Sequence, residues 1–396
     1  MFEKLFGKKD AVPKTDISKR FNLIGRVGQG SMSRVWKAED YAAGNRLVAL
    51  KVLDLEKTKR YEGRFSGLNK PGEAEIAMSL HHPHIVQTLE AGVTTEDEPF
   101  LVMEYIEGSG LGLLVDLQSE QMRRYRLRYM IQIGEALHYF HQQNWIHRDL
   151  CPRNVMVAED NQIKLIDFGL AVPNTADFRK PGNRTGTANY MAPELIKRQP
   201  TDQRIDVFAY AVTCFEMYAK RHPWDAAVTL DAVLQHINKP PEEITALVPK
   251  IDAQIASVIM KGLAADPDDR WSTAAEMVKE FRESEARLVQ AARRAAAQKQ
   301  KKPAAKPVSA QSTLAQPTSE QPSSAKPASA QSASAQPASS KPASAKPAVA
   351  KPKSGPDAKP VPAVKAKPKS AAKVVPGKKS KPRRNPEPDR NPDQSE

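Results

Sequence analysis

The chain has few cysteines and no long apolar run. Its two cysteines, Cys151 and Cys214, are far apart among 396 residues and show no metal-like spacing. This excludes a disulfide scaffold and favours the reducing cytoplasm. No stretch approaches the roughly 18–20 apolar residues of a membrane span, so no transmembrane segment is expected. The N-terminal MFEKLFGKKDAVPK is charged and lacks the apolar core of a signal peptide, which favours a soluble protein.

The C-terminal part of the chain also lacks aromatic side chains. Residues 291–396 consist mainly of Ala, Lys, Pro, Ser and Gln, with 22 Lys and Arg against 6 Asp and Glu, whereas the first 290 residues carry 38 basic and 40 acidic side chains. This composition cannot bury enough apolar surface to offset the entropy of ordering. Residues 325–354 repeat every five residues, as in AKPAS and AQPAS, which predicts an extended, semi-rigid arm.

These changes in composition predict three parts: a basic N-terminal extension (1–19), a globular domain (20–283) and a disordered, low-complexity basic tail (284–396). Strand patterns precede helical ones in the globular domain, which predicts an α+β fold. Strands are expected at FNLIGRV, SRVWKAED, RLVALKVLD, IVQTLEAGV and PFLVMEYI, and helices near residues 72–80, 122–143, 206–219, 251–263 and 272–289. In VALKVL, alternation places Lys51 on the face opposite Val48, Leu50 and Val52.

The most informative motif is HRDLCPRN at residues 147–154, followed by DFG at 167–169. One carboxylate of such a pair can orient a hydroxyl nucleophile, while the Asn and the second Asp supply hard oxygen ligands for Mg²⁺. The motif therefore predicts phosphoryl transfer. These segments closely resemble the catalytic loop and the DFG motif of eukaryotic-type protein kinases, and above all of serine/threonine kinases like those of bacteria.

The resemblance extends from Phe21 to Phe281 and implies a bilobal protein kinase fold, with a small β-rich N-lobe and a larger α-helical C-lobe. It implies ATP and Mg²⁺ as cofactors, and proteins phosphorylated on Ser or Thr as substrates. The catalytic groups would be Asp149, Lys51, Arg153 and Thr187, and the metal ligands would be Asn154 and Asp167.

A glycine-containing loop, GQGSMSRV at residues 28–35, joins the first two strands. Its backbone amides could approach phosphates, although a plain hairpin turn fits the loop alone equally well. Lys51 matches the kinase lysine that holds phosphates, and Glu73 matches its ion-pair partner, with Glu75 as the alternative. The resemblance implies further nucleotide contacts from Val27, Gly28, Gly30, Val35, Ala49, Met103, Glu104, Ile106 and Met156.

Two departures from the kinase pattern concern the catalytic loop and the glycine loop. Cys151 stands where serine/threonine kinases carry a Lys, and Ser33 replaces the third glycine. Arg153 occupies the position at which many tyrosine kinases, which also lack that Lys, place a compensating Arg. We expect an active, hybrid catalytic loop; the alternative is that Arg153 only points to solvent.

Further landmarks lie after the DFG motif. In GTANYMAPE, Thr187 would bridge to the catalytic Asp, and Glu194 would pair with Arg270 of DPDDRW. Asp206 would anchor the backbone of the catalytic loop. Arg148 would dock a phosphorylated residue of the activation segment, with Thr185 as the first candidate and Thr175 as the second.

Three other interpretations bear on function. A nucleotide-binding pseudokinase scaffold would be favoured by loss of Lys51 or of a metal ligand, and neither is lost. The basic tail could make weak contacts with polyanions or nucleic acid, or could be only a soluble spacer. The histidines at 81, 82 and 84 fit the turn before a kinase strand better than a metal site, because no carboxylate or Cys completes one.

Overall fold

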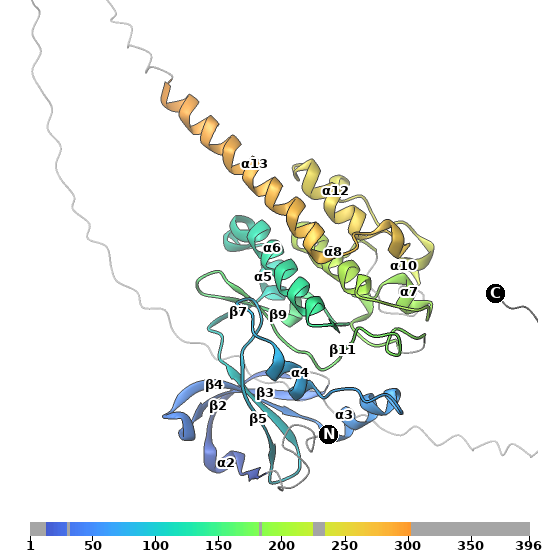
Figure 1. The fold of residues 1–396 in the computed structure, drawn as a ribbon. Coiled ribbons are helices and arrows are strands. Elements are labelled where there is room, and N and C mark those ends of the chain that lie inside the picture. The colour runs from blue at the N-terminus through green and yellow to red at the C-terminus, as the bar shows by residue number, and fades with distance from the viewer. Residues whose placement is uncertain (1–12, 30–31, 182–183, 225–233, 302–396) are drawn as a thin grey trace, which may run out of the picture. The chain divides into compact units, whose positions relative to one another are not determined.

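The first part of the fold is a six-stranded sheet, seen in a computed structural model that describes residues 13–29, 32–181, 184–224 and 234–301. The strand order is β1-β5-β6-β4-β3-β2, with β1 parallel to β5 and the other pairs antiparallel (Figure 1). The bounds are β1 (Lys14–Thr15), β2 (Phe21–Gln29), β3 (Ser33–Asp40), β4 (Arg46–Leu53), β5 (Thr88–Thr94) and β6 (Pro99–Glu104). The five predicted strands are confirmed.

The sheet begins before the predicted globular domain. Strand β1 and helix α2 (Ile17–Arg20) lie within the stretch that composition assigned to an extension over residues 1–19. Arg20 then forms ion pairs with Asp40 at 2.8 Å and Glu90 at 2.6 Å. Both elements are too short for a periodic pattern, and β1 is defined by its long-range pairing with β5. The remainder of the extension, residues 1–12, lies outside the described residues.

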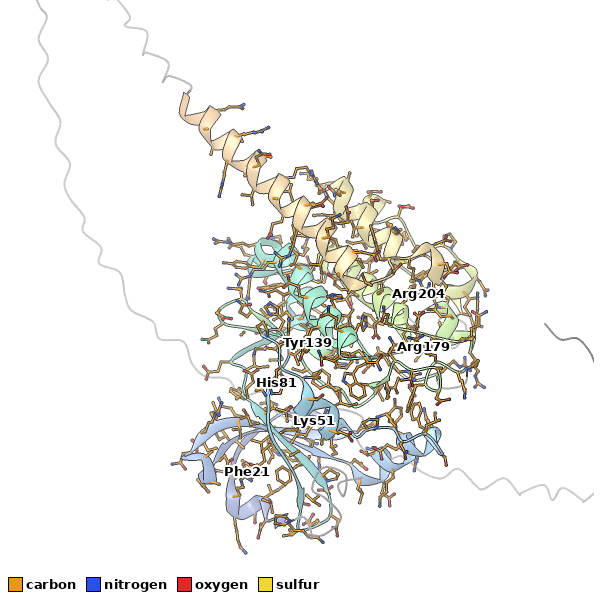
Figure 2. All side chains as sticks on the ribbon, viewed as in Figure 1. Phe21, Lys51, His81, Tyr139, Arg179 and Arg204 are labelled. Atoms are coloured by element: carbon orange, nitrogen blue, oxygen red, sulfur yellow. The ribbon has the colours of Figure 1, made fainter. Side chains whose placement is uncertain are left out.

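Alternation along β4 separates two environments, as its sequence predicts. Val48, Leu50 and Val52 lie in an apolar cluster with Phe21 and Phe100. Burial of such side chains is the main driving force for packing on this face. Lys51 points to the other face, where Figure 2 shows it between the sheet and the helical part of the chain.

Two helices follow β4. Helix α3 (Leu55–Glu62) begins after Asp54, whose side chain accepts a hydrogen bond from Lys57 N at 3.0 Å. This N-cap satisfies one of the free amides of the first turn. A 3-10 turn (Gly63–Phe65) leads on toward helix α4 (Glu73–Ser79), the predicted short helix. Helix α3 has only one buried side chain, so hydrophobic periodicity did not reveal it.

The second part of the fold is mainly helical (Figure 1). Its helices are α5 (Leu111–Leu117), α6 (Glu120–Gln142), α7 (Pro193–Ile196), α8 (Arg204–Ala219), α10 (Gln235–Asn238), α11 (Ile244–Leu247), α12 (Ala253–Gly262) and α13 (Ala274–Lys301). Short strands frame the catalytic loop: β7 (Gly108–Gly110), β8 (Trp145–Ile146), β9 (Val155–Ala158), β10 (Ile163–Leu165) and β11 (Val172–Pro173). The helix predicted from the mostly apolar residues 206–219 is the buried helix α8.

Helix α13 extends past residue 284, where composition placed the start of the tail, and ends at Lys301. The correction has a simple cause. Residues 284–301 are rich in Ala, Arg, Glu, Gln and Lys and contain no proline before Pro303, so helix propensity favours continuation. The rest of the predicted tail lies outside the described residues. Within the described ranges, no helix combines the length and apolar character required to cross a membrane.

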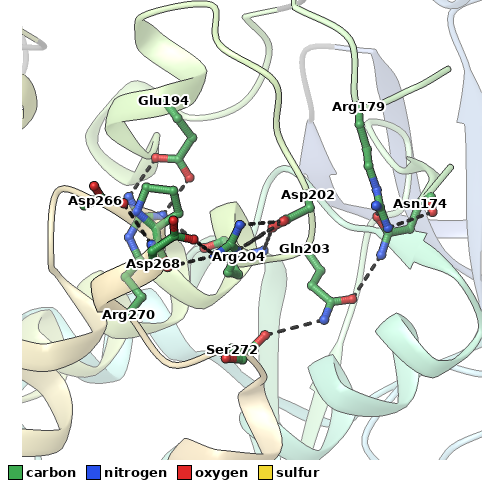
Figure 3. A network of polar contacts seen from close by, with 11 residues as sticks. Asn174, Arg179, Glu194, Asp202, Gln203, Arg204, Asp266, Asp268, Arg270 and Ser272 are labelled. Carbon is green, nitrogen blue, oxygen red and sulfur yellow. Dashed lines mark hydrogen bonds and ion pairs between the residues drawn. The ribbon is translucent and has the colours of Figure 1, made fainter. Parts of the chain in front are cut away.

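A buried ion pair braces the helical part. Arg270 donates to Glu194 through two nitrogens, at 2.6 and 2.7 Å, and both side chains are almost fully buried. Figure 3 shows this predicted pair beside Arg204, which pairs with Asp202 and Asp268. The pair joins α7 to the loop before α13, and its parallel bonds hold the two segments in fixed geometry.

Close packing at Gly134 of α6 gives a test of this architecture. A Cβ there would lie 2.4 Å from Val278 Cγ2 and 2.6 Å from Tyr210 Oη. Gly134→Ala should therefore lower the free energy of unfolding by about 1–3 kcal/mol through overpacking. Thermal unfolding measures this, with Gly25→Ala as the control because its Cβ would meet nothing within 4 Å. Equal melting temperatures of the two variants would contradict the packing.

Candidate active site

Asp149 is held in place by two other side chains. Its Oδ1 accepts hydrogen bonds from the backbone N and the Oγ1 of Thr187, both at 2.8 Å. Its Oδ2 accepts from Asn154 Nδ2 at 3.0 Å, and the same amide donates to the Asp149 carbonyl at 2.8 Å. The predicted bridge between Asp149 and Thr187 is thus present. Together these bonds fix the carboxylate of Asp149 within the catalytic loop.

Asp206 anchors the backbone of the same loop. Its carboxylate accepts from His147 N at 2.7 Å and Arg148 N at 2.8 Å, as the sequence predicts. His141 Nε2 lies 2.9 Å from Oδ2, a contact that no sequence pattern indicated. Burial alone would raise the pKa of Asp206, but these partners hold it below its ordinary value. The anchor supports Arg148, whose φ of 68° is unusual for a non-glycine residue.

Lys51 forms the centre of a buried charge cluster. Its ammonium pairs with Glu73 of α4 and with Asp167 Oδ1 at 2.9 Å. The ion pair expected with Glu73 is therefore present, and the alternative partner, Glu75, is not used. Burial alone would lower the pKa of Lys51, but the two carboxylates raise it above its ordinary value. Burial raises the pKa of Glu73 despite its partner.

Asp167 has an unusual backbone and a defined side chain. Its φ is 70°, and its Oδ1 accepts from Gly169 N at 3.1 Å as well as from Lys51. Burial alone would raise its pKa, but the Lys51 ammonium holds the pKa below its usual value. A Cβ on Gly169 would lie 3.2 Å from Glu73 Oε2, so glycine allows the close approach. The lowered pKa of Asp167 favours its ionised carboxylate, which is the form that a metal ligand requires.

The sheet register places several of the predicted nucleotide contacts opposite one another on neighbouring strands. Gly28 lies opposite Val35, and Val35 lies opposite Lys51. Ala49 lies opposite Met103, the last-but-one residue of β6. Of the other candidates, Val27 is on β2, Glu104 ends β6, Ile106 follows it, and Met156 is on β9. Gly30 lies outside the described residues.

Arg153 takes a position close to the catalytic carboxylate. It is exposed, and its Nη2 donates a hydrogen bond to Thr187 Oγ1 at 3.3 Å. The same Thr187 hydroxyl donates to Asp149. Cys151, by contrast, is buried, and burial raises the pKa of its thiol, so it supplies no charge. Position 153 therefore carries a positive charge beside Thr187, whereas position 151 does not.

The candidate regulatory residues differ in exposure. Arg148 and Thr185 are each only 8% exposed, whereas Thr175 is exposed. Burial raises the pKa of the Tyr61 phenol, and the positive charge of the nearby Arg148 opposes that rise. A phosphate on Thr185 would need the surrounding segment to open.

The oxygen donors fit a magnesium ion that shares its coordination with phosphate. Ile166 N donates to the Asn154 carbonyl at 2.9 Å, which places Asn154 beside the strand that leads to Asp167. Among the described residues, no group of three His, Cys, Asp or Glu could hold a metal without other ligands. Two hard oxygen donors suit Mg²⁺, which keeps waters and takes phosphate oxygens as further ligands.

The curled sheet meets the helical part at a Lys–Glu ion pair and two aspartates. This arrangement is the bilobal architecture of a phosphoryl-transfer domain. Residues 21–281 match the protein kinase domain family. The chain belongs to the protein kinase family. Membership implies the use of ATP and a divalent metal ion.

Similar proteins include bacterial kinases. A probable serine/threonine-protein kinase of Streptomyces coelicolor is 32% identical over 266 residues, which are 65% of this chain and 39% of that protein. The serine/threonine-protein kinase PknB of Mycobacterium tuberculosis is 32% identical over 270 residues, 66% of this chain and 42% of PknB. The chain thus spans about two fifths of the length of these relatives.

The Lys51 cluster distinguishes between the two candidate glutamates. Glu73→Gln removes a buried charge that faces Lys51 and should lower the phosphorylation rate by about tenfold or more, because Lys51 loses a positioning partner. Glu75→Gln, on the same helix, should change the rate by less than about twofold. Steady-state kinetics on both variants measures this, and an equal loss would contradict the assignment.

Proposed function

We propose that this chain transfers the γ-phosphoryl group of ATP to Ser or Thr hydroxyls of protein substrates. The observation that carries the proposal is the fixed geometry of Asp149, whose carboxylate is held by Thr187 and Asn154. The named serine/threonine kinases among the relatives support the choice of acceptor. The two free, buried cysteines suit a cytoplasmic location.

Each side chain of the site has a distinct task in this proposal. Asp149 orients the acceptor hydroxyl and accepts its proton, and Thr187 keeps the carboxylate in position. Lys51 holds phosphate oxygens, beneath a loop that contains Gly28 and Gly30. Mg²⁺, when bound by Asn154 and Asp167, supplies charge neutralisation on the phosphates. Catalysis then consists mainly of positioning and electrostatic stabilisation.

The pseudokinase alternative is not favoured, because Lys51, Asn154 and Asp167 are all present. A weak contact of the basic tail with polyanions remains compatible with kinase activity. Such a contact would depend on released counterions and would weaken as salt rises.

Labelled ATP tests the proposed activity directly. The variants Lys51→Met, Asp149→Asn and Asp167→Asn should each lose most phosphoryl transfer to protein substrates, by about a hundredfold or more. Circular dichroism should show an unchanged fold. An Asp167→Asn variant that phosphorylates as fast as the wild type would show that the catalytic assignment is wrong.

We further propose that Arg153 replaces the missing cation at Cys151. Its hydrogen bond to Thr187 supports a place beside the transferred group. A planar guanidinium is suited to phosphate oxygens and stays charged at all relevant pH values. The loop would then combine a tyrosine-kinase-like Arg153 with Pro152 and Thr187 as in serine/threonine kinases.

The replacement predicts a rescue. Arg153→Ala should lower kcat by roughly 30- to 1,000-fold, the range for loss of one preorganised electrostatic donor. Adding Cys151→Lys to that variant should restore part of the rate, because the ammonium returns to the usual position. Single-turnover kinetics on the single and double variants measures this. An unchanged rate in Arg153→Ala would exclude compensation.

For regulation, we propose that Thr185 receives a phosphate that pairs with Arg148, with the exposed Thr175 as the second candidate. Mass spectrometry of autophosphorylated protein should find phosphate on Thr185, and Thr185→Ala should lower the activity of that preparation. Fully active protein with both threonines unmodified would remove this mechanism.

A further inference from the structure

The segment between β4 and α4, residues 54–72, packs on the chain that follows the DFG motif. The contact that defines it is a hydrogen bond from Tyr61 Oη to the carbonyl of Leu170, at 2.8 Å. Tyr61 is only 5% exposed, and it is the one buried residue of helix α3. A buried hydroxyl that reaches a carbonyl about a hundred residues later fixes two distant segments to each other.

Aromatic contacts extend this attachment along the activation segment, residues 167–194. The rings of Tyr61 and Phe65 pack edge to face at 5.4 Å, and Phe65 packs on Phe178 at 5.7 Å. Lys70 Nζ lies 5.3 Å from the centre of the Tyr61 ring, on the same segment. Such pairs contribute beyond the area that they bury. The 54–72 segment therefore touches the activation segment both at its start and near its middle.

The turn that Tyr61 contacts at Leu170 begins with a residue whose backbone is strained. Asp167 has a φ of 70°, a region that non-glycine residues rarely occupy. Such a conformation persists only when the surroundings determine it from several sides. On one side, Phe168 stacks on Phe140 in the core, with ring centres 5.6 Å apart. On the other side, Ala171 N donates to the Phe168 carbonyl at 3.0 Å, and Tyr61 binds the Leu170 carbonyl between them.

The same segment leads directly into α4, which carries Glu73. Glu73 and Asp167 both pair with Lys51. The 54–72 segment is thus linked to Glu73 through α4, and to the turn that begins at Asp167 through the bond from Tyr61 to Leu170. A shift of this segment would disturb the partner of Lys51 and the turn of Asp167 together.

We propose that residues 54–72 form a latch on the activation segment, in which Tyr61 is a positioning residue that keeps the Asp167 turn in its active arrangement. The inference rests on the proposed kinase function for its effect on rate. The latch itself is a property of the fold and can be measured without activity.

Tyr61→Phe tests the latch because it removes the hydroxyl and keeps the ring. It should lower kcat by about five- to tenfold, the effect of losing one buried hydrogen bond, with the KM for ATP changed less than about twofold. Tyr129→Phe is the matched control, since that phenol is also buried but donates to Asn161, at 2.7 Å. The control should keep the wild-type kcat.

Hydrogen exchange separates the latch from the activity. In an Asp149→Asn background, Tyr61→Phe should speed amide exchange in residues 168–180 by about fivefold or more, while Tyr129→Phe should not. Phe178→Ala should have the same effect on exchange, and Phe178→Tyr, which keeps an aromatic ring, should not.

The two measurements have separate meanings. Unchanged exchange in both Tyr61→Phe and Phe178→Ala would overturn the latch, whatever the kinase assay shows. Faster exchange in a protein without any kinase activity would leave the latch standing and refute the proposed function. Faster exchange with an unchanged kcat would overturn the positioning role of Tyr61.

Discussion

The active arrangement of this protein depends on one buried ammonium. Lys51 comes from the sheet, and its two partners come from α4 and from the turn after β10. A charge removed from water is tolerated only when it is paired and hydrogen-bonded, so the three segments must assemble together. This pairing therefore stabilises the arrangement in which Glu73 and Asp167 both lie beside Lys51.

Two residues with left-handed backbone lie around this centre. Arg148 precedes the catalytic Asp149, and Asp167 begins the DFG turn; their φ values are 68° and 70°. Each is fixed by buried groups, Asp206 for the catalytic loop and the Lys51 cluster for the turn. Strain of this kind is found where function requires a particular geometry. The buried network thus supplies rigidity where phosphoryl transfer needs it.

The catalytic loop lacks a positive charge at the position where serine/threonine kinases carry a Lys. A buried, neutral Cys151 occupies the position of the usual cation, and an exposed guanidinium belongs to Arg153, two positions later. The loop brings Arg153 to Thr187, the same hydroxyl that binds Asp149. If Arg153 supplies the missing cation, as proposed, the charge comes from a different sequence position but lies beside the same catalytic groups.

The sequence by itself determined the family and predicted the reacting groups. Ordered motifs predict Asp149, Asn154 and Asp167 for these roles, because phosphoryl transfer allows few residue types at such positions. Period-two alternation placed Lys51 opposite an apolar face, since successive strand residues point to opposite sides. The choice of Glu73 over Glu75 stayed open, because the start of a short helix cannot be fixed from sequence to within two residues.

Tertiary structure alone decided the contacts between distant segments. Asp206 and His141 lie on different helices, and Tyr61 and Leu170 are separated by more than a hundred residues, so no local pattern encodes either pair. Composition placed the end of the globular part at residue 283. Helix α13 nevertheless continues to Lys301, because the residues that follow keep a high helix propensity although most of them are no longer buried. Local chemistry specifies which groups react, and long-range packing decides how they are held.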